Sequence, residues 1–541
     1  MRLGGGSSAL GDAVARPRDD RQKDLLRPAL EEIIDLGHPL VRLAREIDWG
    51  FLDRRFASVC VPGPGQPGLP TRLVAGLFIL KHMHNLSDEV LCARWLENPY
   101  YQFFCGELSF CHRLPFDRSS LTHWRQRLGE EQLVALIQES LSVAHKTGAL
   151  ATGDLERVVV DTTVQPKAIA HPTDARLCHR ALEKLVGLAR RHDVPLRQSY
   201  RRVAKRAAIM VGRYTHAHQF KRARRELKFL RIRLGRVIRD IRRRIAGNQA
   251  LQERFADLLA LAVRVRFQDH RQRGPKVYAL HAPEVECIGK GKARAPYEFG
   301  CKVSVATPAT KPKGGQFVLH AKALHGNPFD GNTLGPVIAE LEALTGIETR
   351  RIHVDKGYRG HNHAQKFRVW ISGQVLRVTA PIHREMRRRA AVEPVIGHMK
   401  AEHRMGRNYL KGRNGDRINP VLAAAGYNFS LLLRWLERLL RALMRMLLVT
   451  PSTSPKRLTN APHRFFTDDE FICHPMPDIS LSAPASCGKN APPLMPNIWS
   501  LDLNVELEKT IKQRRFPVQA ASDEFGCRVL LASGFQKAEP Q

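Results

Sequence analysis

The sequence predicts an α/β fold in which a sheet-containing domain carries a long basic helical insertion and follows an all-helical domain. Three observations predict it. Residues 158–164 are a run of Val and Thr with a single Asp, the composition of a buried strand. Apolar residues at three-to-four spacing fill long segments before and after this run, as in amphipathic helices. Beyond residue 275, short apolar runs alternate with helical patterns.

The N-terminal part is expected to be loose over residues 1–35 and all-helical over 36–150. The first residues are rich in Gly, Arg and Asp and show no periodicity. Helices are predicted over 39–56, 71–84, 87–96, 117–128 and 130–145. Ser87 is placed to cap its helix and Pro99 to end it. Residues 62–68, with three Pro and three Gly, form a break that no helix tolerates.

The helix predicted around residues 119–128 is a candidate DNA-recognition helix. It offers Ser, Thr, His, Arg and Gln side chains, among them Arg125 and Arg127, which suit contact with bases or phosphates. The alternative is a surface helix with Trp124 in the core. We expect this helix to contact DNA in general terms. For specific contact with bases, we favour the alternative, a surface helix that does not read the sequence.

Asp161 interrupts the apolar run at 158–164. Burying a carboxylate is costly unless a cation or hydrogen bonds accompany it. Two structural explanations for this Asp stay open, and neither involves catalysis. Asp161 lies just past the end of the strand, or it caps a turn. The third explanation is a catalytic role, which two segments far downstream favour.

The first of these segments, 351–360, is a short apolar strand that ends in an acid. Asp355 follows the strand, and Gly357 lets the chain turn sharply away. Lys356 and Arg359 flank this Asp and are well placed to touch phosphate.

The second segment, 389–400, is predicted to be helical. Glu393 and Lys400 lie seven residues apart, about two helical turns, so they project from one face. Arg389 joins that face if the helix is continuous. Because Pro394 disfavours helical geometry at the residue before it, the helix is instead expected to start or kink at Glu393, with Arg389 on a separate segment.

Together, Asp161, Asp355 and Glu393 make a candidate site for divalent metal. Hard cations such as Mg²⁺ take carboxylate oxygens and keep several waters. Two such ions, about 3.5–4 Å apart, suit in-line displacement at phosphorus because they steady the attacking and the leaving oxygen together.

At these residues the chain resembles the DDE-class transposases of bacterial insertion sequences, in the group around insertion sequence five. That family has one Asp at a strand end, a second in Asp-x-Gly-Tyr and a Glu in Arg-x3-Glu-x6-Lys. The matching residues here are Asp161, Asp355 to Tyr358, Arg389, Glu393 and Lys400. Where the wider family often has Tyr, three residues before the Arg, this chain has Met386. The resemblance spans roughly residues 40–445 and is most specific around 393–412.

The resemblance implies a ribonuclease-H-like catalytic domain over 151–448 and an N-terminal region that binds the ends of the element. It implies cleavage at those ends and transfer of the freed 3′-hydroxyl into target DNA, with Asp161, Asp355 and Glu393 as metal ligands. Arg389 and Lys400 would hold phosphates or developing charge. Two Mg²⁺ ions are expected, for which Mn²⁺ can substitute. Joining two ends implies at least a homodimer on double-stranded DNA.

The insertion, residues 176–275, is dominated by basic helical sequence. It holds about 28 Lys and Arg against about seven Asp and Glu. Leu227, Leu230, Leu234, Val237 and Ile241 form one apolar stripe. A solvated basic face is the usual meaning of such charge, but so many like charges repel unless an anion neutralises them, which favours DNA phosphate. The candidate DNA contacts of the whole chain are Arg125, Arg127, Arg224, Arg225, Lys228, Arg231, Lys356, Arg359, Arg404, Arg407 and Lys411.

Several elements are expected after the insertion. Strands are predicted over 276–280, 299–306, 317–324 and 375–379, and a helix over 332–345 that Gly346 ends. The segment 421–449 is interrupted by charges and therefore predicts a buried or amphipathic helix. The tail, 449–541, is rich in Pro and Ser, shows no family resemblance and is expected to be disordered or appended.

Charge and composition indicate a nucleic-acid partner. The formal net charge is +35, and 43% of the residues are hydrophobic. No stretch of eighteen apolar residues predicts a membrane span, and no signal peptide is visible. The ten cysteines show no paired framework, which suits a reducing cytoplasm. A cytoplasmic bacterial protein, associated with the nucleoid when bound to DNA, is therefore expected.

Two alternative functions stay open. A metal-dependent nuclease with the same fold would cut DNA without joining it. A catalytically inactive transposase remnant would still bind DNA through its basic surface.

Overall fold

The computed structural model describes residues 28–61, 68–269, 274–289 and 296–448, together with Gln272 and the short strand β1 (Val14–Ala15). The predicted break at 62–68 lies almost entirely outside these residues, and so does the tail 449–541. The described residues belong to one compact unit.

The N-terminal part is helical, as predicted. Its elements are α1 (Leu30–Ile33), α2 (Pro39–Glu46), α3 (Trp49–Phe56), β2 (Cys60–Val61), α4 (Thr71–Met83), α5 (Asp88–Glu97), α6 (Pro99–Phe104) and α7 (Ser120–Lys146). Ser87 caps α5, because its side chain accepts a hydrogen bond from the Val90 N–H. Gly129 divides α7 into two helices, since its φ of +67° is outside the helical range.

One mixed sheet forms the centre of the described chain. Its strands are β3 (Arg157–Pro166), β4 (Glu286–Gly289), β5 (Tyr297–Pro308), β6 (His320–Leu324), β7 (Arg351–Val354) and β8 (Val369–Ile371). The order is β4-β5-β3-β7-β8, and β6 pairs with β5 beside β4. β5 is antiparallel to β3, whereas β3, β7 and β8 run parallel. The mixed α/β architecture predicted from the sequence is therefore observed.

Two predicted strands are wrong. Residues 276–280 form no strand, because the side chain of Gln268 pairs with the backbone of Val277 in place of a neighbouring strand. Residues 375–379 form turns and loop, with Val375 and Leu376 more than four-fifths exposed. The edge strand lies a few residues earlier, at β8, where Val369 is buried.

Helices cover the sheet on both faces. They are α8 (Thr152–Leu155), α13 (Leu334–Thr345), α14 (Ala380–Arg388), α15 (Val392–Glu402) and α16 (Gly412–Leu448). Val392 of α15 packs against Val159 of β3, and Asn419 of α16 donates a hydrogen bond to Gln165. Because alternate residues of a strand share a face, α15 and α16 cover the face that carries Val159, Asp161 and Gln165.

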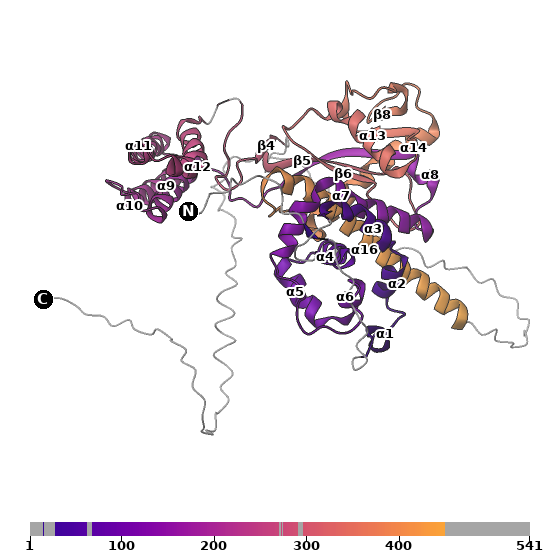
Figure 1. Cartoon of the computed structure of the whole chain (residues 1–541). Helices are drawn as coiled ribbons and strands as arrows, with labels where there is room; N and C mark the ends of the chain where they lie inside the picture. The colour runs from indigo at the N-terminus through magenta and orange to yellow at the C-terminus, as the bar shows by residue number, and fades with distance from the viewer. Residues whose placement is uncertain are drawn as a thin grey trace, which may run out of the picture. The chain divides into compact units, whose positions relative to one another are not determined.

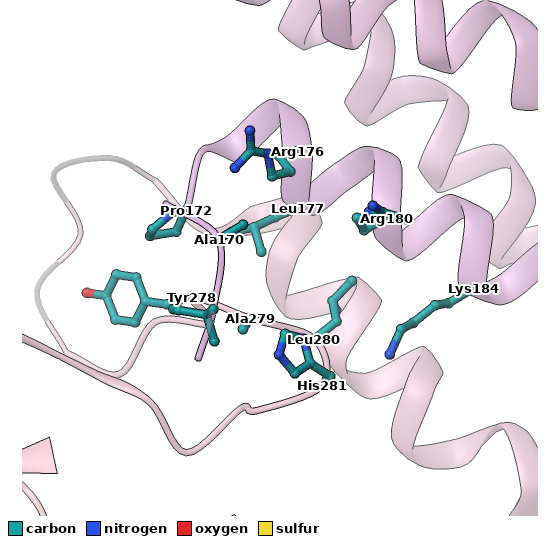
Figure 2. A pocket seen from close by; sticks show the side chains of 11 residues that line it. Ala170, Pro172, Arg176, Leu177, Arg180, Lys184, Tyr278, Ala279, Leu280 and His281 are labelled. Carbon is teal, nitrogen blue, oxygen red and sulfur yellow. The ribbon is translucent and has the colours of Figure 1, made fainter. Parts of the chain in front are cut away.

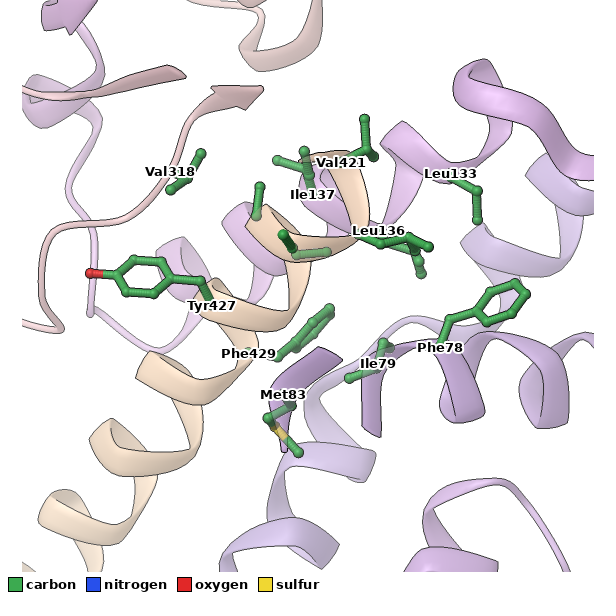
Figure 3. Close-up of a cluster of buried hydrophobic side chains, with 14 of the residues drawn as sticks. Phe78, Ile79, Met83, Leu133, Leu136, Ile137, Val318, Val421, Tyr427 and Phe429 are labelled. Atoms are coloured by element: carbon green, nitrogen blue, oxygen red, sulfur yellow. The ribbon is translucent and has the colours of Figure 1, made fainter. Parts of the chain in front are cut away.

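The main hydrophobic core crosses the boundary placed at residue 150 from the sequence. α16 contacts α7, α4, α2 and β6, and residues of α4, α7 and α16 pack together there (Figure 3). The fully buried Asn428 joins α16 to the chain before β6. It accepts a hydrogen bond from the Val318 N–H and donates one to the Val318 carbonyl, both at 2.8 Å.

The insertion has a core of its own. It contains α9 (Asp174–Arg191), α10 (Arg201–His216), α11 (Phe220–Ile245) and α12 (Gln249–Phe267), which contact one another (Figure 1). The predicted stripe on α11 is confirmed: Leu230, Leu234, Val237 and Ile241 are buried in this separate core and Leu227 packs against it. Across the residues that the structure describes, no helix is long and apolar enough to cross a membrane.

Candidate active site and nucleic-acid contacts

The pairing of β3 with β7 brings two of the predicted acids together. Val159 stands opposite His353 in this parallel pair. Two residues further along each chain, Asp161 and Asp355 occupy neighbouring positions, and Asp355 follows directly on the last residue of β7. Asp161 is therefore not at the end of β3 but in its middle, at the level where β7 stops.

Arg389 lies between these two carboxylates. One of its terminal nitrogens is 3.8 Å from Asp161 Oδ2 and the other is 3.9 Å from Asp355 Oδ1. The Thr162 N–H also donates to Asp161 Oδ1, at 2.7 Å. Burial nevertheless raises the pKa of Asp161 to about 6, and the charges of Asp355 and Glu393 act in the same direction. A cation at this position would therefore stabilise the ionised pair.

Glu393 is the second residue of α15, and Arg389 lies on a separate 3-10 turn, Arg389–Ala391. This is the arrangement that Pro394 favours, because a residue before Pro fits a helix only poorly. Glu393 is exposed, and it is close enough to Asp161 to influence the pKa of that carboxyl. Lys400 lies at the other end of α15 and is half-buried.

A buried ion network fixes the turn that carries Arg389. On α14, Glu385 accepts a hydrogen bond from His353 at 3.0 Å and forms ion pairs with Arg157 and Arg351. Arg388 donates to the carbonyl oxygens of residues 309 and 310, beyond the end of β5. Because these contacts hold α14 to three strands, Arg389 is positioned above the two Asp side chains.

A further acid, Asp330, lies next to the site and was not predicted. It is the first residue of a 3-10 turn, Asp330–Thr333, which leads into α13. It accepts a hydrogen bond from Thr162 Oγ1 at 3.1 Å, on the face of β3 opposite Asp161, and forms an ion pair with Lys302 at 3.1 Å. Tyr358 of the Asp-x-Gly-Tyr motif is buried near it. Burial raises the pKa of Tyr358, and the Asp330 and Asp161 charges add to this. The sequence signal was weak because an Asp before a helix is usually only a cap.

The donor set fits divalent metal in its chemistry. Asp161 and Asp355 stand side by side, and Glu393 is close enough for its charge to raise the pKa of Asp161. Within the described part of the chain, no three His, Cys, Asp or Glu side chains are close enough to hold one ion between them. An ion bound by Asp161 and Asp355 would compete with Arg389 for the same oxygens.

The candidate DNA contacts divide into exposed and internal side chains. Those of Arg224, Arg225, Lys228, Lys356, Arg359, Arg407 and Lys411 are exposed. Arg231 instead joins α9 to the end of α12, because it contacts Asp174 and the carbonyl oxygen of Gln268. Arg127 is half-buried, with its guanidinium 5.9 Å from the Trp124 ring centroid. Trp124 is in the core, as the surface-helix alternative expected.

Four of the candidates, from distant parts of the sequence, line one pocket of about 680 Å³. Arg125 comes from α7, and Arg404, Arg407 and Lys411 come from the segment between α15 and α16. Arg125 is only 3% exposed and donates two hydrogen bonds to Asp88. Sequence patterns did not predict that these residues would meet.

A second cavity, of about 550 Å³, lies where α9 begins. Figure 2 shows Arg176, Arg180 and Lys184 along one helix, with Tyr278 and His281 on the segment that lines the other side. The three cations are four residues apart, so their backbone positions follow one another about every 6 Å along the helix. These residues were not predicted as contacts, because they lay inside a general excess of basic residues.

Comparison with known proteins gives the family. A family model described as a transposase domain (DUF772) matches residues 28–127, from α1 into α7. An uncharacterized protein, ORF8 of the nfe locus of Rhizobium meliloti, is 50% identical over 206 residues, which cover 38% of this chain and 99% of that protein. No solved structure matches the chain. The chain therefore belongs to a family of transposases.

Proposed function

We propose that this transposase is of the DDE class and related to the group around insertion sequence five. In this proposal it cuts DNA at the ends of its element and joins the freed 3′ end to target DNA. The observation that carries the proposal is the parallel register of β3 and β7, which sets Asp161 beside Asp355 under Arg389. In this proposal Glu393, on the helix that covers this face, is the third acid, and its charge acts on Asp161.

The sheet supports a ribonuclease-H-like catalytic domain. Three antiparallel strands, β6, β5 and β3, are followed by the parallel strands β7 and β8. The insertion α9–α12 enters between β3 and the next strand in sequence, as the family resemblance implies. Helices on both faces protect the sheet, so the acids sit on a rigid base.

Each residue has a separate task in the proposed reaction. Asp161, Asp355 and Glu393 would hold Mg²⁺ or Mn²⁺, which when bound activates the attacking oxygen and stabilises the leaving one. Arg389 lies within 4 Å of both Asp side chains, a position suited to charge that develops on the phosphate. Lys356, Arg359 and Lys400 would hold neighbouring phosphates. No covalent bond to the protein is needed.

The test uses the protein with DNA taken from the flanks of its own gene, including any inverted repeats there, and a plasmid target. We expect nicked and joined products with Mg²⁺ or Mn²⁺ and none with a chelator. Asp161→Asn, Asp355→Asn and Glu393→Gln should each lower cutting by several orders of magnitude while DNA binding is kept. The matched control is Glu402→Gln, an exposed acid on α15, which should cut normally.

The outcomes separate the alternatives. Cut DNA without any joined product would indicate a nuclease. Binding without cutting, in the unaltered protein, would indicate an inactive remnant. If Asp161→Asn cuts as well as the unaltered protein, the assignment of this site is wrong.

A further inference from the structure

The pocket lined by Arg125, Arg404, Arg407 and Lys411 is strongly basic. Five of its lining residues are Lys or Arg, counting Lys81, against two acids, Asp88 and Glu89. Its volume of about 680 Å³ is in the range of sites that enclose a small molecule or one unit of a polymer.

The base of the pocket holds more positive than negative charge. Lys81 and Arg125 both pair with Asp88, at 2.6 and 2.8 Å, so two cations share one carboxylate. Both side chains are almost completely buried. Arg125 Nε is buried without a hydrogen-bond partner, although a buried donor normally has one. Burial and the Arg125 charge lower the pKa of Lys81 to about 8. An anion in the pocket would relieve both effects.

The rim of the pocket combines cations with an exposed aromatic ring. Tyr409 is 61% exposed, and the guanidinium groups of Arg404 and Arg407 lie 5.9 and 5.4 Å from its ring centroid. The residue before it is anchored: Asn408 donates to Asp416, which is paired with Lys167 beyond the end of β3. A ring held in this way on a basic surface is typical of sites where nucleic-acid bases stack.

We infer that this pocket binds one phosphate group of a DNA strand, with an unpaired base of that strand stacked on Tyr409. The inference rests on the proposed action on DNA. Arg side chains bind phosphate through two parallel N–H donors, and the ring of Tyr409 offers a surface that any base can use. A paired base inside a duplex cannot present its face to the ring, so the site would select a strand with an unpaired nucleotide.

Strand β3 sets the distance from this pocket to the proposed catalytic acids. Asn408, the residue before Tyr409, forms backbone hydrogen bonds with Pro166 and Ala168 at the end of β3. The five residues of strand from Asp161 to Pro166 span about 17 Å, or about five base-pair rises of B-DNA at 3.4 Å each. The pocket therefore lies beside the proposed site of cutting and not within it.

The test measures binding of the full chain to two labelled duplexes by fluorescence anisotropy. One duplex is blunt, and the other has the same sequence with a four-nucleotide single-stranded end. We expect the second to bind about tenfold more tightly, in keeping with stacking of one base. Tyr409→Leu should abolish this difference and leave binding to the blunt duplex unchanged, whereas Tyr409→Phe should keep it.

Two further variants test the charges. Arg407→Gln combined with Lys411→Gln should reduce binding of the single-stranded end much more than binding of the blunt duplex. Arg54→Gln, at an exposed position outside the pocket, is the control and should affect both duplexes equally. Thermal unfolding of each variant shows whether the fold is kept.

The result distinguishes this inference from the proposed function. Equal binding of the two duplexes by the unaltered protein, or an equal decrease for both in Tyr409→Leu, would overturn the pocket assignment alone. Failure to bind any DNA would overturn both. If inorganic phosphate competes as well as the single-stranded end, the site is one for free phosphate and the assignment to DNA is wrong.

Discussion

Asp161 and Asp355 show how a single guanidinium can hold two acids in place. Arg389 touches both carboxylates at close to 4 Å, too far for strong hydrogen bonds. Their negative charge is therefore only partly compensated, which agrees with the raised pKa of Asp161. A divalent ion bound there would attract the same carboxylate oxygens more strongly than Arg389 does. Arg389 would then be available to bind a phosphate group.

Glu139 gives a pH-dependent prediction far from this site. It is 3% exposed on α7 and accepts a hydrogen bond from the Asp48 N–H at 2.8 Å. Burial raises its pKa from 4.5 to about 7. The folded state therefore holds this proton more tightly than the unfolded state, so stability falls as pH rises from 4.5 through 7, by about 3 kcal/mol at most.

Glu139→Gln should remove this dependence. We expect its melting temperature to be close to that of the unaltered protein at pH 5 and clearly higher at pH 8, measured by calorimetry. Glu131→Gln, an exposed position on the same helix, serves as the control and should show no such gain. A variant that is equally or less stable at pH 8 would contradict the prediction.

The sequence revealed some side chains of the site and not others. Asp161 could be predicted because an acid within a run of Val and Thr is unusual, and Asp355 because Gly357 follows it. Asp330 could not, since an Asp at a helix start is common. Arg125 was predicted as a DNA contact on its residue type, but its burial against Asp88 depends on packing between α5 and α7 that no local pattern encodes.

Among the helices, α16 and α4 approach each other unusually closely. A Cβ added to Gly426 of α16 would lie 2.5 Å from the Cβ of His82 and 2.6 Å from its carbonyl carbon. Because the contacted carbonyl carbon belongs to the backbone, moving a flexible side chain would not relieve this clash. Gly426→Ala should therefore destabilise the fold by about 3 kcal/mol, the upper part of the range for overpacked cores.

Chemical denaturation would check this prediction. The matched control is Gly187→Ala in α9, where nothing lies within 4 Å of the added carbon. That change should be neutral or stabilise by up to about 1 kcal/mol, because Ala favours a helix more than Gly does. Equal effects of the two substitutions would show that the close approach is not important.

Long periodic elements could be predicted, whereas short strands could not. The capped helix α5 and the apolar stripe of α11 follow from local patterns. The segment 276–280 has the composition of a strand, but Gln268 satisfies part of its backbone instead. Residues 375–379 are apolar yet exposed, because the edge of the sheet is already formed by β8. In both segments, contacts with other parts of the chain determine whether a strand forms, and local composition does not show these contacts.

The separate core of the insertion predicts that α9–α12 can be removed without unfolding the rest. Arg231 contacts both Asp174, at the start of the insertion, and Gln268, at its end, so the two ends lie close together. Replacing 174–268 with a short Gly-Ser linker should leave one cooperative unfolding transition. DNA affinity should fall. Its dependence on salt should also weaken, by roughly one unit of slope for each phosphate that the insertion had neutralised.

Anisotropy with a duplex over a series of salt concentrations measures that slope. An unchanged slope would show that the basic face of the insertion is solvated and does not contact DNA. A shortened chain that fails to unfold cooperatively would contradict the independence of its core. The exposed Arg224, Arg225 and Lys228 of α11 are the first positions for single substitutions.

The division of the chain was only partly visible in its sequence. The basic insertion could be delimited, because its composition differs from its surroundings. The close union of the N-terminal helices with the sheet could not, since it depends on α16, more than 250 residues downstream of α7, filling the space between them. Charge predicted a polyanionic partner, and the comparisons confirm membership of a transposase family.

The late position of α16 has a consequence for synthesis of the protein. The ribosome makes α4 and α7 long before the helix that covers their apolar residues. A gene truncated anywhere before codon 412 would therefore encode a chain without α16. The apolar residues of α4 and α7 would stay exposed in that chain, which makes it a substrate for proteases. Fragmented copies of the gene that lack α16 would therefore not yield a folded unit of N-terminal helices and sheet, even where they still encode the separate core of α9–α12.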